Sequence, residues 1–531
     1  MLYTVMAFIA IFKKSDSAMG FTGAIQMLAW TVFIFSANLT LMMTVPGDGT
    51  PNASYLFLGV AEWFVLLMLM LLYRTAWSRG HMLLMQNICM LLSVGYVIIS
   101  RIDITRAVKQ LIISGVGLVI FILMPLFRKH MESLRNYKYI YGLLGLISLG
   151  GVFLLGAMVN GANLSLNIGG FAFQPSEFMK IVFILFMASA LCDTIRSKDV
   201  VLTGFFALAH VGILVLSRDL GSAMIFYVIF IMMLFLATGR WRYVFGGLLA
   251  GAAGSVVCYF LFSHVRVRVD VFMNPWNSNY IDNMSYQITQ SLFAISYGGL
   301  WGAGLTQGTP TSIPNVETDF IFSAITEEMG LVFAVCLLLL CINCFIRILI
   351  LSGSYSNRFF QLFTYGAAVC YIFQTFLTVG GETKFIPLTG VTLPLVSYGG
   401  SSVLSTLTMF GMIEMIFILH DERTARFKQR YDQEHSANAY ADLPQGYSGY
   451  LQGDPAGYAD VPGGYKGNSG GYNGSTGGDL KDYADISGGS SDHQGSYMDG
   501  LSDHEDDISL YDDVPENFPV NGISEDGIFD S

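Results

Sequence analysis

This chain consists largely of long apolar runs that are separated by short polar segments. A helix that crosses a membrane needs about 20 apolar residues. Twelve stretches approach or exceed that length: 20–45, 53–73, 81–100, 110–127, 139–159, 178–192, 202–217, 220–237, 243–263, 321–350, 360–379 and 388–419. Residues 1–12 are apolar but too short to cross alone, which predicts a truncated or interfacial helix. The pattern predicts an all-α polytopic membrane protein.

One long polar segment, 264–330, interrupts this pattern. It contains glycine pairs and eight charged residues: Arg266, Arg268, Asp270, Asp282, Glu317, Asp319, Glu327 and Glu328. Functional residues concentrate in loops held by a rigid scaffold, and charges near membrane depth are costly unless they serve a purpose. The segment is therefore the first candidate for the functional region.

Composition supports a membrane protein and separates the C-terminal tail from it. Hydrophobic residues make up 53% of the chain and charged residues 13%, values typical of membrane proteins. The net charge of −11 is uneven, because residues 432–531 carry 20 acidic residues and only 2 basic ones. This tail repeats Gly, Tyr, Ser and Asp and cannot bury a core. It is predicted to be disordered, either as a spacer or as a protein-interaction segment.

The distribution of Lys and Arg predicts the orientation in the membrane. If the tail is cytoplasmic, the inside loops carry 13 basic residues and the outside loops carry 7. Because cytoplasmic loops are enriched in Lys and Arg, this orientation is favoured over its reverse. The loop 264–320 then faces outward.

Two further stretches place polar groups beside predicted spans. In QPSEFMK, Glu177 lies near a helix start and three residues before Lys180, so the two side chains can pair on one face. The alternative is a purely structural role, in which Glu177 lies at the helix start and Lys180 neutralises its charge. In FIPLTGVTLPLVSYGGSS, Pro387 and Pro394 break a span at membrane depth. Such broken backbone is tolerated where it lines a cavity or is buried in protein.

Taken in order, the motifs are specific. The chain contains QPSEFMK, DLGSA, YQITQSLFAISYGGLWGAGL, TDFIFSAITEEMG and TGVTLPLVSYGGSS. With these, it resembles the SEDS family, the FtsW/RodA/SpoVE group, over about 81–419. The resemblance implies three parts: 1–80 with extra N-terminal spans, a ten-span core at 81–420, and the acidic tail at 421–531.

The resemblance also implies an activity. Members are peptidoglycan glycosyltransferases of the bacterial plasma membrane that polymerise lipid II, an undecaprenyl-pyrophosphate-linked disaccharide peptide, for cell division or cell shape. The expected protein partner is a class B penicillin-binding protein, and nucleic acid is not an expected partner. The rival functions are a lipid II flippase and a catalytically inactive scaffold of the cell-wall machinery.

In this family an outward-facing acid shortly before the YQ pair is taken as the catalytic residue. Here the expected position, six residues before Tyr286, is Tyr280, and the nearest carboxylate is Asp282. Asp282 is the expected acid/base, Asp270 is the reserve candidate, and an Asx turn is the structural alternative for Asp282. The stretch NGANLSLNIGG also lacks the basic residues and Trp that the family usually has there.

The remaining expectations concern substrate contacts. Arg266, Arg268 and Lys384 are candidates to hold the pyrophosphate. Asp319 and Glu327 either line a cavity or form structural ion pairs with those cations. The resemblance adds five polar residues as candidate contacts: Gln174, Glu177, Lys180, Ser397 and Ser401. No metal site is predicted from the residues, and a divalent cation is the only cofactor considered.

Overall fold

The computed structural model describes residues 1–12, 16–44, 51–78, 80–155, 157–159, 162–168, 171–193, 197–276 and 285–441. Contacts divide the chain into two units, 1–424 and 425–531, which are treated separately. Of the second unit only the end of one helix is described. Asp282 and residues 442–531 of the predicted disordered tail lie outside the described residues. Residues 432–441, which were also predicted to be disordered, are instead helical and form the end of a long helix.

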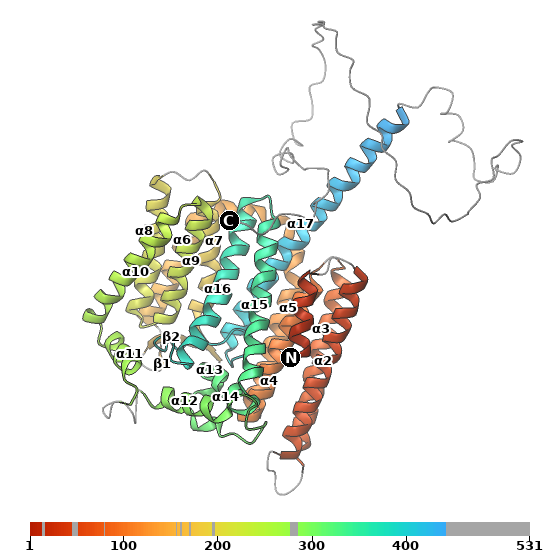
Figure 1. The fold of residues 1–531 in the computed structure, drawn as a ribbon. Helices are drawn as coiled ribbons and strands as arrows, with labels where there is room; N and C mark the ends of the chain where they lie inside the picture. The colour runs from red at the N-terminus through yellow and green to blue at the C-terminus, as the bar shows by residue number, and fades with distance from the viewer. Residues whose placement is uncertain are drawn as a thin grey trace, which may run out of the picture. The chain divides into compact units, whose positions relative to one another are not determined.

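The first unit is a bundle of long apolar helices (Figure 1). Within the described residues, eleven helices are long and apolar enough to cross a membrane. These and the shorter α7 are α2 (Asp16–Thr44), α3 (Ala53–Ala76), α4 (Met82–Ile102), α5 (Ile104–Leu123), α6 (Lys138–Leu155), α7 (Pro175–Leu191), α8 (Ser197–Leu216), α9 (Leu220–Thr238), α10 (Trp241–Leu261), α15 (Leu331–Ser354), α16 (Arg358–Glu382) and α17 (Gly400–Ala441). The prediction of a polytopic helical membrane protein is confirmed.

The connections contain short elements. They are α1 (Leu2–Phe12), the 3₁₀ helices η1 (Met124–His130), η2 (Glu132–Tyr137) and η3 (Pro310–Ser312), and α11 (Ser263–Met273), α12 (Tyr286–Gly298), α13 (Val316–Asp319) and α14 (Ile321–Met329). Between α6 and α7 the strands β1 (Ala157–Val159), β2 (Ala162–Ile168) and β3 (Phe171–Phe173) form an antiparallel sheet in the order β1-β2-β3. This sheet is a small addition to an otherwise helical fold.

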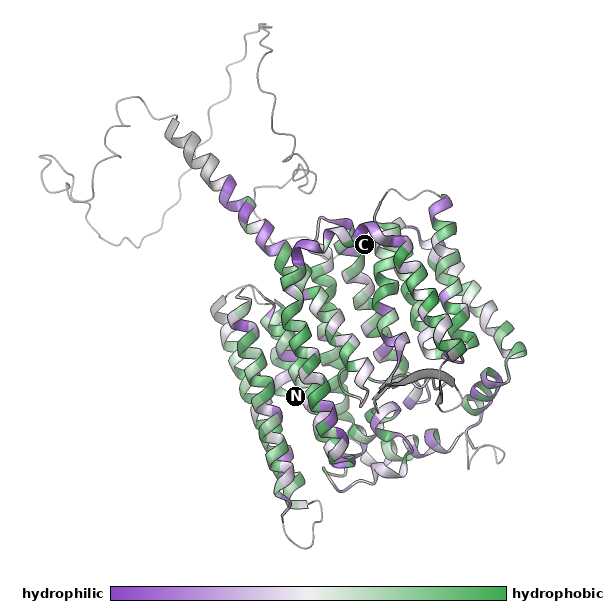
Figure 2. Cartoon of the chain, turned by 180° about the vertical axis from the view of Figure 1, so that it is seen from behind, coloured by the Kyte–Doolittle hydropathy of each residue, from purple (hydrophilic) through white to green (hydrophobic). Residues whose placement is uncertain are grey.

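Burial distinguishes central from peripheral helices. In the most apolar window of α4, 89% of the residues are buried within the protein, against none in α10. The green band of Figure 2 shows hydrophobic residues along the helices, with hydrophilic residues gathered toward their ends. An exposed apolar helix is stable only where lipid replaces water, so the exposed apolar surface of α10 fits a lipid-facing position.

Two predicted spans begin later than expected. The stretch 321–350 is interrupted at Gly330, whose φ of 86° ends α14 and starts α15. Gly330 also packs against the backbone of Trp301 and Gly302, leaving no room for a side chain. The stretch 388–419 becomes helical only at Gly400, because the proline- and glycine-containing segment before it cannot form a regular helix. The predicted break of this span is confirmed.

The polar connections gather at one end of the first unit. Because successive helices alternate in direction, the β1–β3 connection, the elements α11–α14 and the α16–α17 connection all lie at the same end (Figure 1). Direct bonds link these elements: Arg268 of α11 donates to the Leu388 carbonyl of the α16–α17 connection, and Ser291 of α12 donates to the carbonyl of Glu382, the last residue of α16. The candidate site is built at this end.

Candidate active site

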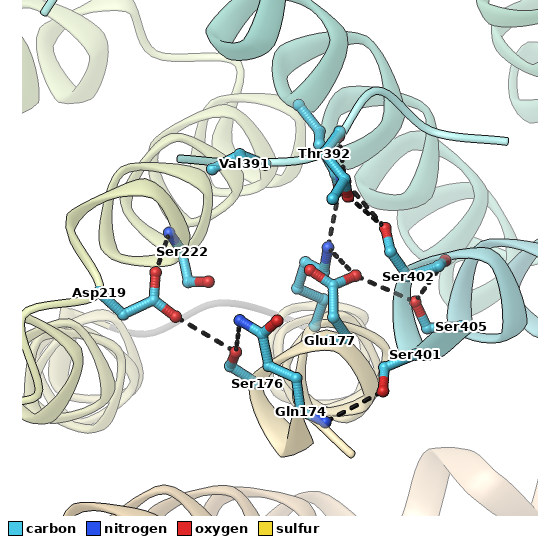
Figure 3. A network of polar contacts seen from close by, with 12 residues as sticks. Gln174, Ser176, Glu177, Asp219, Ser222, Val391, Thr392, Ser401, Ser402 and Ser405 are labelled. Carbon is cyan, nitrogen blue, oxygen red and sulfur yellow. Dashed lines mark hydrogen bonds and ion pairs between the residues drawn. The ribbon is translucent and has the colours of Figure 1, made fainter. Parts of the chain in front are cut away.

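The QPSE motif forms a buried polar network at the start of α7 (Figure 3). Pro175 occupies the first helical position, where its missing N–H costs nothing. The Lys180 ammonium donates to the Glu177 carboxylate and to the Gln374 amide oxygen, both at 2.7 Å. Both charged side chains are at most 6% exposed. The pair predicted from the spacing is therefore present, and it is deeply buried.

The same network reaches the broken segment before α17. Gln374 donates to the Thr392 carbonyl at 3.1 Å, and Ser405 donates to Glu177 at 3.2 Å. Thr392 and Ser402 are linked through their hydroxyls at 2.8 Å. Every one of these polar groups is satisfied by another element, so irregular backbone is stable here at membrane depth.

Ser397 and Ser401 stabilise the irregular segment before α17 and the start of that helix. The Ser401 hydroxyl accepts the Gln174 N–H at 3.0 Å, and the Ser397 hydroxyl accepts the Leu393 N–H at 2.9 Å. The Ser397 carbonyl accepts from the Gln110 side chain of α5 at 3.1 Å. In the described structure, these two serines make structural contacts with the backbone.

Asp219 connects this network to α9. One carboxylate oxygen caps α9 by accepting the Ser222 N–H at 3.0 Å, and the other accepts the Ser176 hydroxyl at 3.2 Å. Burial raises the pKa of Asp219 because it disfavours the charged form. The positive field of Arg268 also reaches this carboxylate.

Arg268, near the start of the polar segment, interacts with two acids. Its guanidinium donates to the Leu388 carbonyl at 2.6 Å and interacts electrostatically with Asp219 and Asp319. Burial raises the pKa of Asp319 to about 6, although Arg268 opposes the shift. A side chain at Gly390, which has a φ of 71°, would contact the Asp319 carboxylate at 3.6 Å. Asp319 therefore interacts with Arg268 electrostatically, and no ion pair or hydrogen bond joins the two side chains among the described residues.

The other acids of α13 and α14 pair across to α4 and α5. Glu317 forms an ion pair with Arg106, and Glu328 pairs with Arg101 at 3.1 Å. Burial raises the pKa of Glu328 against the effect of Arg101. Glu327 does not pair with the expected cations: one of its oxygens accepts the Thr309 N–H at 2.8 Å, and the other has no hydrogen-bond partner within the described chain.

The three candidate cations have different surroundings. Arg266 is exposed, donates to the Phe260 carbonyl at 3.2 Å and stacks over Tyr259. Arg268 is partly buried and engaged as described. Lys384 is partly exposed at a φ of 56°, and its ammonium has no partner among the described residues. Of the three, Lys384 is the most available to an anion.

One buried acid of this end was not predicted. Glu382, in the last turn of α16, is fully buried and accepts both the N–H and the hydroxyl of Ser323, each at 2.8 Å. No local pattern could indicate it, because its partner is 59 residues away. In the described parts of the chain, no three His, Cys, Asp or Glu side chains are arranged to hold a metal ion.

Known proteins are similar to this chain in sequence. Residues 73–422 match the FTSW_RODA_SPOVE family, described as a cell cycle protein. Peptidoglycan glycosyltransferase RodA of Mycobacterium tuberculosis (strain ATCC 25618 / H37Rv) is 35% identical over 363 residues, covering 63% of this chain and 77% of the relative. Probable peptidoglycan glycosyltransferase FtsW of Aliivibrio salmonicida is 34% identical over 277 residues, covering 49% and 68%.

A solved structure is also similar to this chain. A chain of a peptidoglycan synthase complex, described for the structural coordination of polymerization and crosslinking, superposes with a TM-score of 0.56 at 27% identity. The superposition covers 64% of this chain and 97% of that one. The family match takes in every motif on which the resemblance was based. This multi-pass bacterial membrane protein belongs to the FtsW/RodA/SpoVE family.

Proposed function

We propose that this chain is a membrane-embedded peptidoglycan glycosyltransferase that polymerises lipid II into glycan strands for cell division or cell shape. The observation that carries the proposal is that residues 73–422 match the family. Similar proteins, with 34–35% identity, are named as peptidoglycan glycosyltransferases. The site supports it with an available cation, Lys384, beside buried acids and polar backbone at one end of the bundle.

Asp282 acts as the general base. The acceptor sugar hydroxyl loses its proton to the carboxylate as its oxygen attacks the anomeric carbon of the lipid-linked donor. The bond from that carbon to the pyrophosphate breaks, and the lipid pyrophosphate leaves with the bonding electrons. An α-linked donor thereby gives a β-linked product in one inverting step, so no covalent glycosyl-enzyme is required. Lys384 and Arg266 stabilise the charge on the leaving group.

The anchors on both sides of Asp282 support this role. Before it in the chain, Arg268 of α11 is bonded to the Leu388 carbonyl. After it, Ser291 of α12 is bonded to the Glu382 carbonyl. Leu388 lies in the connection between α16 and α17, which also carries Lys384, and Glu382 is the last residue of α16. The ends of the segment with Asp282 are therefore held near the cation proposed to bind the pyrophosphate.

Arg268 has a different proposed role from Lys384 and Arg266. Its guanidinium already bonds to Leu388 and interacts with two acids, so we assign it to positioning α11. Gln174, Glu177, Lys180, Ser397 and Ser401 shape the polar interior beneath the reacting groups. Asp319 and Glu327 line its acidic edge.

The reaction takes place at the outer membrane face. The sequence count of 13 inside against 7 outside basic residues supports this orientation, and the polar connections that carry the candidate residues share one end. The loop 264–320 is then extracellular and the tail cytoplasmic. We keep the division into an N-terminal addition at 1–80, a core at 81–420 and a tail at 421–531.

A class B penicillin-binding protein is the proposed partner. The structurally similar chain comes from a complex that coordinates polymerization with crosslinking, and crosslinking needs a transpeptidase. The second candidate function is a lipid II flippase, which the buried Glu177–Lys180 pair and the broken backbone before α17 favour, since transporters also use broken helices at polar interior sites.

Purified full-length protein incubated with lipid II tests the proposal. Wild type should form polymer, Asp282→Ala and Asp282→Asn should abolish it, and Asp270→Ala, the matched control on α11, should retain it. Loss with Asp270→Ala and retention with Asp282→Ala would move the base to Asp270. Chelation and re-addition of Mg²⁺ in the same assay measures any cation requirement.

The same preparation separates the rival functions. Vesicles containing the protein and labelled lipid II report movement between leaflets. Movement without polymer, even with the penicillin-binding protein present, would establish a flippase instead of a polymerase. Neither movement nor polymer, with partner binding retained, would establish an inactive scaffold.

A further inference from the structure

Glu382 is a buried carboxyl to which the proposed mechanism gives no role. It is fully buried in the last turn of α16, and one of its oxygens, Oε1, has no hydrogen-bond partner within the described residues. Burying a carboxyl with one oxygen unsatisfied costs free energy, and an apolar side chain would avoid that cost. The carboxyl must therefore provide something that an apolar residue at this position could not.

Its second oxygen, Oε2, caps α14. Ser323 is in the first turn of this nine-residue helix, whose N-cap residue, Phe320, makes no side-chain capping bond. Glu382 accepts the Ser323 N–H at 2.8 Å, which is closer than the Phe320 carbonyl at 3.2 Å, so the carboxyl is the nearer acceptor for this donor of the first helical turn. Glu382 thus acts as an N-cap supplied by another helix.

The same cluster extends to α12. The Ser323 hydroxyl donates to Glu382 at 2.8 Å and lies 2.7 Å from the Ser291 hydroxyl, which bonds to the Glu382 carbonyl at 2.9 Å. Both serines are completely buried. Three elements that are distant in sequence therefore meet at Glu382, and α12 among them begins two residues after the undescribed segment 277–284.

We infer that Glu382 is a positioning residue for glycan polymerisation. Acting through Ser323 and Ser291, it sets the placement of α14 and α12 against the end of α16, two residues before Lys384. This inference rests on the proposed polymerase activity. Reaction rates depend steeply on such placement, since a misplacement of about 1 Å can cost about 100-fold.

Two substitutions at Glu382 and one control test this role. Glu382→Gln keeps a carbonyl oxygen that can accept both Ser323 donors, whereas Glu382→Leu has the bulk but no acceptor. The control is Glu62→Leu in α3, where the glutamate is also fully buried but lies in the N-terminal addition. Polymer formation is measured against lipid II concentration, and hydrogen–deuterium exchange is measured over α12 and α14.

The expected result is a loss of kcat without a matching change in KM. Glu382→Leu should lower kcat by at least about 10-fold with KM within about two-fold of wild type, and speed exchange in α12 and α14. Glu382→Gln and Glu62→Leu should stay near wild type in both measurements. Wild-type kcat and exchange in Glu382→Leu, or an equal defect in Glu382→Gln, would overturn the inference.

Further arms keep the test decisive. If Glu382→Leu cannot be purified in a folded state, Ser291→Ala replaces it, because it removes the Ser291 hydroxyl through which α12 bonds to Glu382. This variant should show the same loss of kcat at unchanged KM. A wild-type kcat in Ser291→Ala would overturn the inference. If wild type forms no polymer, the proposed function fails. Exchange over α12 and α14 then still decides whether Glu382 positions these helices.

Discussion

Removing the Lys180 ammonium should destabilise the protein more than removing any surface cation. In the structure it donates to Glu177 and Gln374, both at 2.7 Å, with 4% of its own side chain and 6% of the Glu177 side chain exposed. At 2.7 Å and an effective dielectric constant of about 20, the gross attraction of the pair is about 6 kcal/mol. Desolvation of both charges offsets much of it.

The cost of the substitution Lys180→Met comes from the charge that remains. Among the described residues, Glu177 would stay buried with Ser405 as its remaining side-chain donor, and breaking a buried pair in this way typically costs about 3–5 kcal/mol. The double variant Glu177→Gln, Lys180→Met carries no buried charge, so it should recover most of that loss. Arg135→Ala is the surface control, because the Arg135–Asp193 pair is 48% and 60% exposed and should contribute less than about 1 kcal/mol.

Denaturant-induced unfolding in detergent micelles measures all three variants under one condition. The reasoning predicts the order Lys180→Met least stable, the double variant intermediate, and Arg135→Ala near wild type. A double variant as unstable as Lys180→Met would refute the account based on an uncompensated charge. It would show instead that packing around the two long side chains determines stability.

Other predictions follow from the same end of the molecule. Because burial raises the pKa of Asp319 to about 6, the folded state binds its proton more tightly than the unfolded state does, so stability should fall as pH rises from about 4 to 6, by at most about 3 kcal/mol. Asp319→Asn should remove this slope in unfolding curves measured across that range, and an unchanged slope would contradict the assignment. Gly95→Ala would place a Cβ 2.3 Å from the Val396 carbonyl oxygen, so it should displace the segment before α17 and lower polymer formation at least about 10-fold. Gly115→Ala is the matched control, because Gly115 has open space around it. Equal polymer formation by the two variants would contradict the packing argument.

Local patterns identified the spans and the pair within one motif. Hydropathy alone located the helices, because lipid requires long apolar runs whatever their neighbours are. The Glu177–Lys180 pair followed from a spacing of three residues on a helix. The break before α17 followed from Pro387 and Pro394, since proline disrupts a helix irrespective of tertiary contacts.

Predictions that depended on distant partners fared less well. Asp319 and Glu327, which were expected to serve alike as cavity-lining or ion-pairing residues, lie on separate helices, because α13 ends at Asp319 and α14 starts at Ile321. The late start of α15 was also missed, because Gly330 adopts its conformation where it packs against Trp301 and Gly302. A helical pattern contains no information about such a contact.

The sequence by itself determined the class of protein and its family, because apolar run length and ordered motifs are local properties. The tertiary structure alone decided which partner each charged residue has. Arg101 pairs with Glu328, Arg268 donates to the Leu388 carbonyl, and Glu382 accepts from Ser323. These partners are 227, 120 and 59 residues apart. A buried charge is stable only beside its partner, and that partner is set by how the helices pack.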